Sequence, residues 1–196
     1  KRIIFNGNGY SDEWVAEAER RGLPNIKCMV DAVPALVKPE AVEIFEKHGV
    51  YTKAEMESRA EVMYETYSKT INIEALTMID MAKKQIVPAT IKYQTSLAES
   101  VNAIKVASSA VDTSVQEALM ADISTNLKDM YAALAHLEEV AGKAEAMEEG
   151  AEQGHYYHDV VFAAMDELRK PADKLEMLVA KSAWPFPSYG DLIFEV

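Results

Sequence analysis

The stretch that decides the fold is TKAEMESRAEVMYETYSKTINIEALTMIDMAKKQIVPA, residues 52–89, and the chain continues from it without a glycine to residue 107. Its apolar side chains recur at steps of three and four residues, the spacing that places side chains on one face of an α-helix. The members of this series are Met56, Ala60, Met63, Tyr67, Ile71, Ala75, Met78, Ala82, Ile86, Ala89, Tyr93, Leu97, Val101 and Ile104. We therefore expect one helix over residues 52–107, which would be about 80 Å long at roughly 1.5 Å per residue.

The sequence also indicates where this helix begins and where it bends. Thr52 and Glu55 form a capping-box pattern, in which the hydroxyl accepts from the Glu55 amide and the carboxylate accepts from the Thr52 amide. Pro88 should bend the helix, because proline lacks an amide donor and its ring clashes with the preceding turn. Between Ile71 and Met81 apolar residues occur on nearly every side of the helix, so we expect this part to be buried on several sides. The residues that join the stripe there are Ile73, Leu76 and Ile79.

Shorter elements precede the long helix. Residues 2–5, RIIF, are either strand-like or the end of a helix, and the Asn-Gly pairs after them favour a tight turn. Ser11 or Asp12 should then cap a helix that runs to Arg21, because Gly22 suits the residue after a helix end.

Two further short helices are expected before residue 52. Asp31 should cap a helical turn, DAVPALV, and Pro39 suits the first position of a helix that Gly49 ends. These elements carry apolar residues that should pack against the long helix. They are Val33, Leu36, Val42, Ile44 and Phe45.

A second long helix should follow the break after residue 107. Thr113 with Gln116, or Ser114 with Glu117, can form its capping box, and the helix should run to about Glu149. Its apolar residues again come in steps of three and four. They are Val115, Leu119, Ile123, Leu127, Met130, Leu134, Leu137 and Val140.

A third helix is expected over Tyr156–Val179, with either Ala163 or Ala164 inward and with an interruption at Pro171. Its other inward residues are Val160, Leu168, Leu175 and Leu178. Short connections make neighbouring helices antiparallel. The predicted fold class is therefore all-α, an antiparallel helical bundle built on one very long kinked helix.

The chain finishes in an extended aromatic tail, WPFPSYGDLIFEV, residues 184–196. Its large apolar side chains should dock either on this bundle or on another chain, and docking on this bundle is the favoured alternative. They are Trp184, Phe186, Tyr189 and Phe194.

Composition excludes several classes of protein. The chain has 196 residues, 49% of them apolar, so it can bury a sizeable core. Its formal net charge of -12 opposes binding to nucleic acid and to anionic membrane surfaces. No apolar run is long enough for a transmembrane helix, and no signal-peptide pattern is present. A lone cysteine, Cys28, provides neither a disulfide nor a cysteine metal site, which fits a reducing, cytoplasmic setting.

Two patterns could carry chemistry, and a structural interpretation is favoured for both. Gly7 and Gly9 follow a strand-like run, but Asp12 takes the third glycine position of a dinucleotide-binding loop, so we favour a capped turn. Glu152 and His155 have the E-x-x-H spacing of di-iron bundles, and His158 follows three residues later. A di-iron bundle needs a second such pair with further glutamates, so we favour a polar helix start with surface histidines.

The remaining candidates give no catalytic centre either. We interpret Cys28 as a packed small residue. The methionines of the long helix, Met56, Met63, Met78 and Met81, are interpreted as adaptable core rather than as a cofactor site. From residue chemistry alone we therefore assign no catalytic, cofactor-binding or metal-ligating residue.

Three segments together resemble the C-terminal part of type III glutamine synthetases. They are FNGNGYSDEW at 5–14, KTINIEALTMIDMAKKQIVPA at 69–89 and WPFPSYGDLIF at 184–194. They occur in the order expected for that family and span nearly the whole chain, whereas residues 93–182 are far less specific.

The resemblance implies a full-length enzyme that joins ammonia to glutamate through a γ-glutamyl phosphate. Such an enzyme uses ATP with magnesium or manganese ions and assembles as stacked rings, typically dodecamers. The family's N-R-T-S-P-F and N-K-F-E-F-R motifs are absent from this sequence. The resemblance therefore carries over no catalytic, cofactor-binding or metal-ligating residue, and ATP and the metal ions belong to the full-length enzyme.

We expect residues 1–51 to be the tail end of the conserved synthetase body and residues 52–196 to form the C-terminal bundle. Because the chain begins at Lys1 in an apolar run, we interpret it as a piece of a longer polypeptide. The leading hypothesis is a non-catalytic, structural segment whose partners are the catalytic body and sister subunits. The alternatives are a stand-alone scaffold bundle and, as the weakest, a metal-dependent enzyme that uses Glu152 and His155.

Overall fold

The computed structural model describes residues 4–194, and these residues form helices, turns and loops without any strand. The all-α prediction is confirmed. The chain divides into two compact units, residues 1–67 and residues 68–196, with the boundary inside the long helix. Our division at residue 51, which concerns the body of a longer protein, stays a prediction.

The first helix of the first unit, α1 (Asp12–Arg20), begins and ends as its sequence predicts. Ser11 is the N-cap, and its hydroxyl accepts a hydrogen bond from the Trp14 amide at 3.4 Å. Gly22 has a φ of +66°, the left-handed conformation that ends helices. Of the expected RIIF element, residues 2 and 3 lie outside the described residues, and Ile4 with Phe5 forms neither helix nor strand.

The next two helices are α2 (Met29–Leu36) and α3 (Pro39–Lys47). Pro39 takes the first position of α3, and Gly49 follows its end with a φ of +62°, as predicted. The expectation that Asp31 caps α2 was wrong, because α2 begins earlier and the Asp31 carboxylate accepts from the Cys28 thiol instead. Ile44 was expected to be packed but is 58% exposed.

Helix α2 packs on α4 (Lys53–Met81) through a small apolar cluster. Val30 and Val33 of α2 meet Ala60 and Tyr64 of α4, and these four residues are buried. The predicted capping box of α4 is present. The Glu55 carboxylate accepts from the Thr52 amide at 2.7 Å, and the Glu55 amide donates to the Thr52 hydroxyl at 3.3 Å.

The long helix continues as predicted, through α4, a π-helical turn η1 (Ala82–Ile86) and α5 (Val87–Ala107). The sequence predicts a bend at Pro88, and the structure places the π turn directly before it. A wider turn helps the backbone pass a proline, which has no amide to donate and whose ring crowds the preceding turn.

The burial of the long helix follows the predicted stripe at most positions but departs from it at several, among them Met63, which is exposed while Tyr64 is buried. After the π turn, the fully buried side chain is Thr90 rather than its half-buried neighbour Ala89. The expectation of burial on several sides between Ile71 and Met81 was wrong, since Ile73 is 65% exposed and Leu76 is 49% exposed. Helices of this unit cover one side of that segment only.

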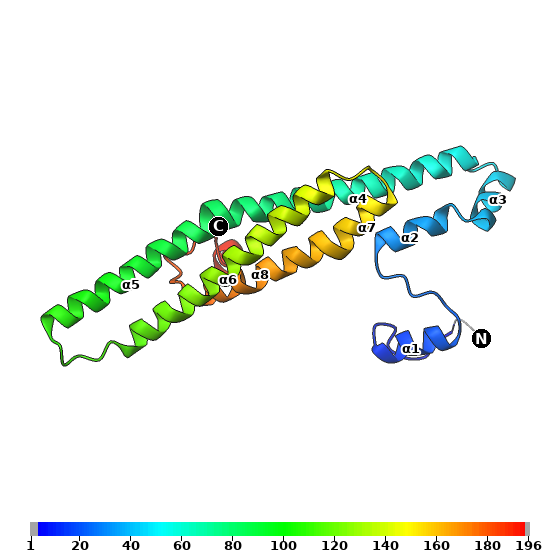
Figure 1. The fold of residues 1–196 in the computed structure, drawn as a ribbon. Coiled ribbons are helices and arrows are strands. Elements are labelled where there is room, and N and C mark those ends of the chain that lie inside the picture. Colours follow the sequence, from blue (N-terminus) through cyan, green and yellow to red (C-terminus); the bar gives the residue numbers. More distant parts are fainter. Residues whose placement is uncertain (1–3, 195–196) are drawn as a thin grey trace. The chain divides into compact units, whose positions relative to one another are not determined.

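The second unit is built around α6 (Ser114–Glu145), which runs antiparallel to α5 and beside α8 (Phe162–Leu178) (Figure 1). A short α7 (Ala151–Tyr156) and a second π turn, η2 (Tyr157–Val161), lead into α8. The core between α6 and α8 consists of fully or nearly fully buried apolar side chains. They are Ile123, Met130, Leu134, Leu137, Ala164, Leu168 and Leu175.

Three predictions about these helices were wrong, and the first is the inward position of Val115, which is 76% exposed. Neither proposed capping box forms at α6, because the Asp112 carboxylate accepts from the Ser114 amide at 2.9 Å and Glu117 accepts from the Thr113 hydroxyl at 2.8 Å. Pro171 does not interrupt α8, in which it is buried inside the helix. Its ring packs in the core, and this burial offsets the single backbone hydrogen bond that a proline forfeits.

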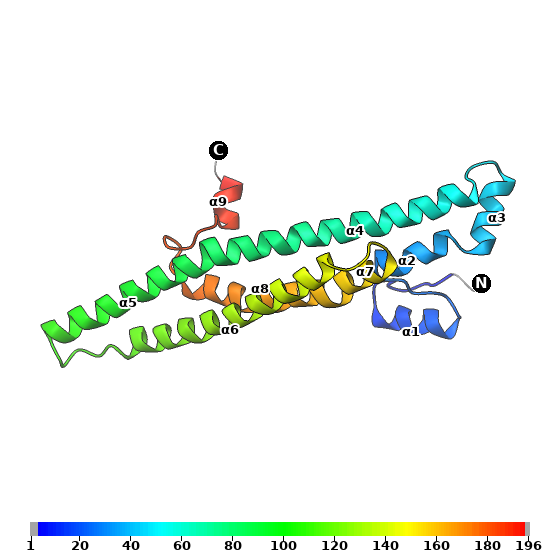
Figure 2. The ribbon, with the colours of Figure 1, turned by 45° about the horizontal axis from the view of Figure 1, so that its top comes forward.

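The last helix is α9 (Tyr189–Phe194), which stands off from the packed helices of its unit (Figure 2). Upstream of it, Trp184 and Phe186 are half-buried, with ring centroids 6.2 Å apart. The expected docking of the tail on the bundle is thus confirmed for these two aromatics. It is wrong for Tyr189 and Phe194, which are more than 80% exposed.

None of the helices within residues 4–194 combines the length and the apolar character needed to cross a bilayer.

Candidate functional surfaces

The glycine turn before α1 is a capped turn, as favoured from its sequence. The Asn8 side chain accepts from the Tyr10 amide at 3.0 Å, and the Ser11 hydroxyl donates to the Asn8 carbonyl at 2.8 Å. Asp12 and Glu13 occupy the first turn of α1. Two carboxylates at this helix terminus oppose the binding of a phosphate there.

The predicted E-x-x-H residues lie at the start of the third helical segment. Glu152 and His155 belong to α7, and His158 belongs to η2, where its Nδ1 lies 2.7 Å from the Asp159 carboxylate. Within residues 4–194, no group of three or more histidine, cysteine, aspartate or glutamate side chains is placed to hold a metal ion. The structure therefore does not bring the residues of a di-iron site together.

Cys28 contacts the cluster between α2 and α4, in line with a packed small residue. Its Sγ donates to the Asp31 carboxylate at 3.0 Å. The hydrogen bond to Asp31, followed by partial burial, raises the pKa of the Cys28 thiol above its ordinary value. A thiol with a raised pKa is a poor nucleophile at neutral pH.

The methionines of the long helix divide between core and surface. Met56 is completely buried, as the core interpretation predicts, but Met63 is 38% exposed. Met78 and Met81 are half-buried and line a groove of the second unit.

This Met–aromatic groove encloses about 490 Å³ between the long helix, α8 and the segment before α9. Its apolar lining residues are Met78, Met81, Ala82, Ile86, Phe162, Met165, Leu168, Ala172, Trp184 and Phe186. Its charged lining residues are Glu74, Asp166, Arg169, Asp173 and Glu176. The groove is therefore apolar at its floor and mostly acidic at its rim.

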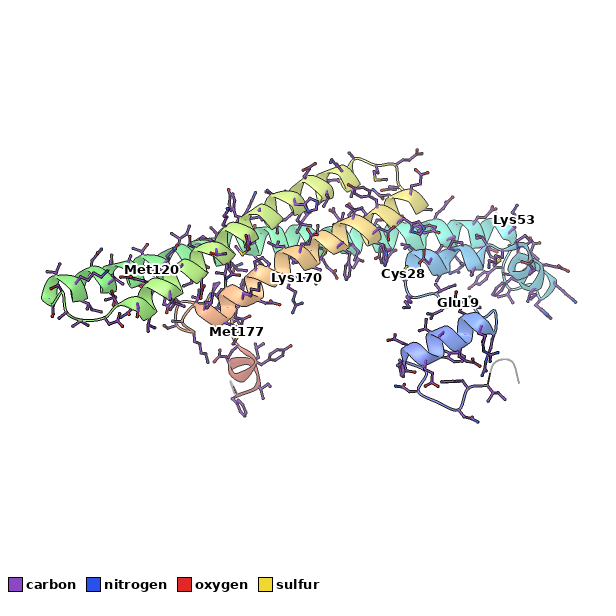
Figure 3. The ribbon with its side chains drawn as sticks, turned by 60° about the horizontal axis from the view of Figure 1, so that its bottom comes forward. Glu19, Cys28, Lys53, Met120, Lys170 and Met177 are labelled. Atoms are coloured by element: carbon purple, nitrogen blue, oxygen red, sulfur yellow. The ribbon has the colours of Figure 1, made fainter. Side chains whose placement is uncertain are left out.

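Two carboxylates of the rim are already neutralised within α8. Asp166 pairs with Lys170, which Figure 3 labels on α8, at 2.6 Å, and Asp173 pairs with Arg169 at 3.3 Å. Among the described residues, Glu74 and Glu176 have no ion-pair partner. The sequence carries a sign of this, since neither glutamate has a lysine or arginine three or four residues away.

Other apolar side chains remain uncovered in this unit. Ile73 and Leu76 form a patch on α4, one turn apart. A second group of exposed apolar side chains lies on α9, where Leu192 is 63% exposed and Ile193 is 66% exposed. Large exposed apolar patches are one mark of a surface that binds a partner.

Residues 1–105 match the family model described as the glutamine synthetase C-terminal domain. The chain belongs to this family. The glutamine synthetase of Butyrivibrio fibrisolvens is 39% identical over 196 residues, which cover 100% of this chain and 28% of that protein. The type-3 glutamine synthetase of Dictyostelium discoideum is 28% identical over 98% of this chain and 27% of its own length. The glutamine synthetase of Bacteroides fragilis is 30% identical over 98% of this chain and 27% of its own length.

The resemblance to type III glutamine synthetases drawn from three segments is thus confirmed. The chain spans little more than a quarter of the length of these curated relatives. The chain therefore corresponds to one part of each of those longer proteins.

Proposed function

We propose that this chain is a non-catalytic, structural segment of a longer glutamine synthetase, and that it helps the subunits of that enzyme assemble. The family and the fraction of each relative's length that the chain spans support this proposal. In the proposed enzyme, a catalytic body elsewhere in the polypeptide joins ammonia to glutamate at the expense of ATP, with magnesium or manganese ions.

The observation that carries the structural role is the uncovered patch on α4. Ile73 and Leu76 are half-exposed or more, although they lie in the middle of a helix whose opposite face is buried. Burying an aliphatic side chain contributes about 1.5–3 kcal/mol, so a partner surface on this patch would be stabilising. We propose that the catalytic body or a sister subunit covers it in a homo-oligomer, of the dodecameric kind that the family resemblance implies.

The excluded partners and the cellular location are proposed on the basis of charge and cysteine content. A net charge of -12 opposes contact with nucleic acid and anionic membranes, so neither is a proposed partner. We propose a cytoplasmic location, because the single cysteine has no disulfide role.

The first test is the mass of the natural protein, detected in its source with an antibody against residues 184–194. A band several times heavier than the 21.7 kDa of this chain is expected. A band at that mass would overturn the proposal in favour of a stand-alone scaffold bundle.

The second test is the double variant Ile73→Asp with Leu76→Asp in the full-length protein. These side chains are exposed in the unit itself, so the change should leave the helices folded and should shift the assembly to smaller particles in analytical ultracentrifugation. Val106→Asp with Val115→Asp is the matched control, since these valines are 89% and 76% exposed at the far end of α5 and the start of α6. An intact oligomer with full glutamine-forming activity in the Ile73/Leu76 variant would refute an assembly role of this patch.

A further inference from the structure

We propose that the Met–aromatic groove is a docking site for a basic amphipathic α-helix carried by another polypeptide. The proposal goes beyond an assembly role, because it assigns a binding partner of defined chemistry to a surface that the patch on α4 does not include.

The floor of the groove suits the apolar face of a helix. Met78, Met81 and Met165 supply flexible side chains that adapt to different anchor residues. Trp184 and Phe186 close one side with an edge-to-face aromatic pair. Amphipathic helices dock in such hydrophobic grooves through anchors at spacings of three, four and seven residues.

The rim selects the charge of the partner. Four carboxylates and one guanidinium line the groove, and the carboxylates of Asp166 and Asp173 are paired within α8. Glu74 on α4 and Glu176 on α8 keep uncompensated negative charge on two of the helices that form the groove. Lysine or arginine residues beside the apolar anchors of an incoming helix would complement these two carboxylates.

The same charge argues against a second copy of this chain as the occupant. Each copy carries a net charge of -12, so its approach to an acidic rim is electrostatically opposed. The exposed helix α9 of a second copy contributes Asp191 beside its apolar residues and offers no basic group within Tyr189–Phe194.

One π-helical turn of the second unit lines the groove, and the other directly precedes a lining residue. Ala82 and Ile86 of η1 line it on one side, and Phe162, directly after η2, lines it from α8. Phe162 is 53% exposed there. Single π turns inside α-helices occur frequently at functional sites, because they re-aim side chains at a cost in backbone regularity.

The test uses a labelled synthetic Leu/Lys peptide of about 18 residues, with leucines on one helical face and lysines on the other. Its binding to the full-length protein is measured by fluorescence anisotropy at low and high salt. We expect saturable binding, with slowed hydrogen exchange in residues 74–86 and 162–176. A Leu/Glu peptide of the same pattern should bind at least about tenfold more weakly.

The decisive variants reverse the two unpaired charges. Glu74→Lys with Glu176→Lys should weaken binding about tenfold or more, and Phe162→Ala should weaken it without changing its salt dependence. Glu148→Lys with Glu149→Lys changes the net charge equally at a turn outside the groove and should change the affinity less than about threefold. Tyr131→Ala, at a side chain that is 62% exposed on α6, is the control for Phe162.

Equal losses for the two charge-reversed pairs would show non-specific attraction to an acidic protein and would overturn the proposal. Absence of saturable binding, or protection confined to other residues, would overturn it as well. Neither result bears on the subunit assembly, which is measured separately with the Ile73 and Leu76 variant. Competition by unlabelled copies of this chain would identify a second copy as the occupant and would also reject the proposed partner.

Discussion

Lys181 donates to the carboxylate of Asp191 at 2.6 Å, and the same carboxylate accepts from the Ser188 amide at 2.8 Å. The two contacts link the segment after α8 to the start of α9. The Asp191 amide also donates to the Ser188 hydroxyl, which completes a capping box at α9. The ionised Asp191 carboxylate thus links α9 to the segment that precedes it.

Acid should therefore release α9. The Lys181 ammonium and the Ser188 donors lower the pKa of Asp191 to about 2, below its ordinary value of 3.8. Because the folded-state pKa is depressed, the stabilisation is present above pH of about 4 and is lost as the pH falls through about 2. Carbon-13 NMR of the Asp191 carboxyl should give this pKa, and Lys181→Ala should raise it. An Asp191 titration at its ordinary value in the unsubstituted chain would contradict the observed pairing.

Removal of the hydroxyl that caps α4 should destabilise the first unit. Thr52→Ala removes one half of the capping box, and the expected loss is about 1 kcal/mol in the free energy of unfolding. Ser58→Ala is the control, because Ser58 is an exposed residue inside α4 in the same unit and does not cap the helix. Urea unfolding, monitored by Trp14 in the first unit, measures the difference. A loss for Ser58→Ala as large as that for Thr52→Ala would count against the cap.

The buried hydroxyl of Thr90 should be a source of instability. Thr90 is completely buried, and its hydroxyl has no hydrogen-bond partner. Thr90→Val keeps the shape and removes the unpaired polar atom, so we expect a gain of about 1 kcal/mol in unfolding free energy. Thr95→Val, at an exposed hydroxyl bonded to the Ile91 carbonyl, should change stability by less than about 0.5 kcal/mol. A marked loss of stability in Thr90→Val would show that the hydroxyl is in fact bonded.

The contact of α6 with α8 should dominate the stability of the second unit. Leu137 on α6 is completely buried, and Leu137→Ala is expected to cost about 2–5 kcal/mol through lost burial and a cavity. His136→Ala, one residue away, removes only an exposed side chain whose Nδ1 lies 3.2 Å from Glu167. The cost of that control should stay below about 1 kcal/mol. Thermal unfolding by circular dichroism compares the two, and similar costs would contradict the assigned core.

Local chemistry made most of the helical architecture predictable. The capping box at Thr52 and the glycine after α3 act within a few residues, so the sequence alone locates those helix ends. The cap of α6 was missed because Asp112, outside the two patterns considered, competes for the Ser114 amide. Such competition depends on loop geometry that spacing rules do not describe.

Burial was less predictable, because it depends on which neighbours are present. Apolar residues on all sides of the helix around Ile73 and Leu76 predict that this segment is buried. The pattern does not say whether this chain or another chain buries it. The groove is a similar case. Trp184 and Phe186 were recognisable as docking residues, whereas the role of Glu74 depends on its placement beside α8.

The π turn η1 affects which side chains of the long helix face the core. A straight α-helix with steps of four residues drifts steadily around its axis, by roughly 40° per step, away from any fixed neighbour. The buried residues Ala82, Ile86 and Thr90 are each four apart, so the wide turn absorbs that drift and keeps one side facing inward. The extra residue of η1 thus corrects the register of the long helix, and deleting one residue there would rotate all later side chains by about 100° about the helix axis.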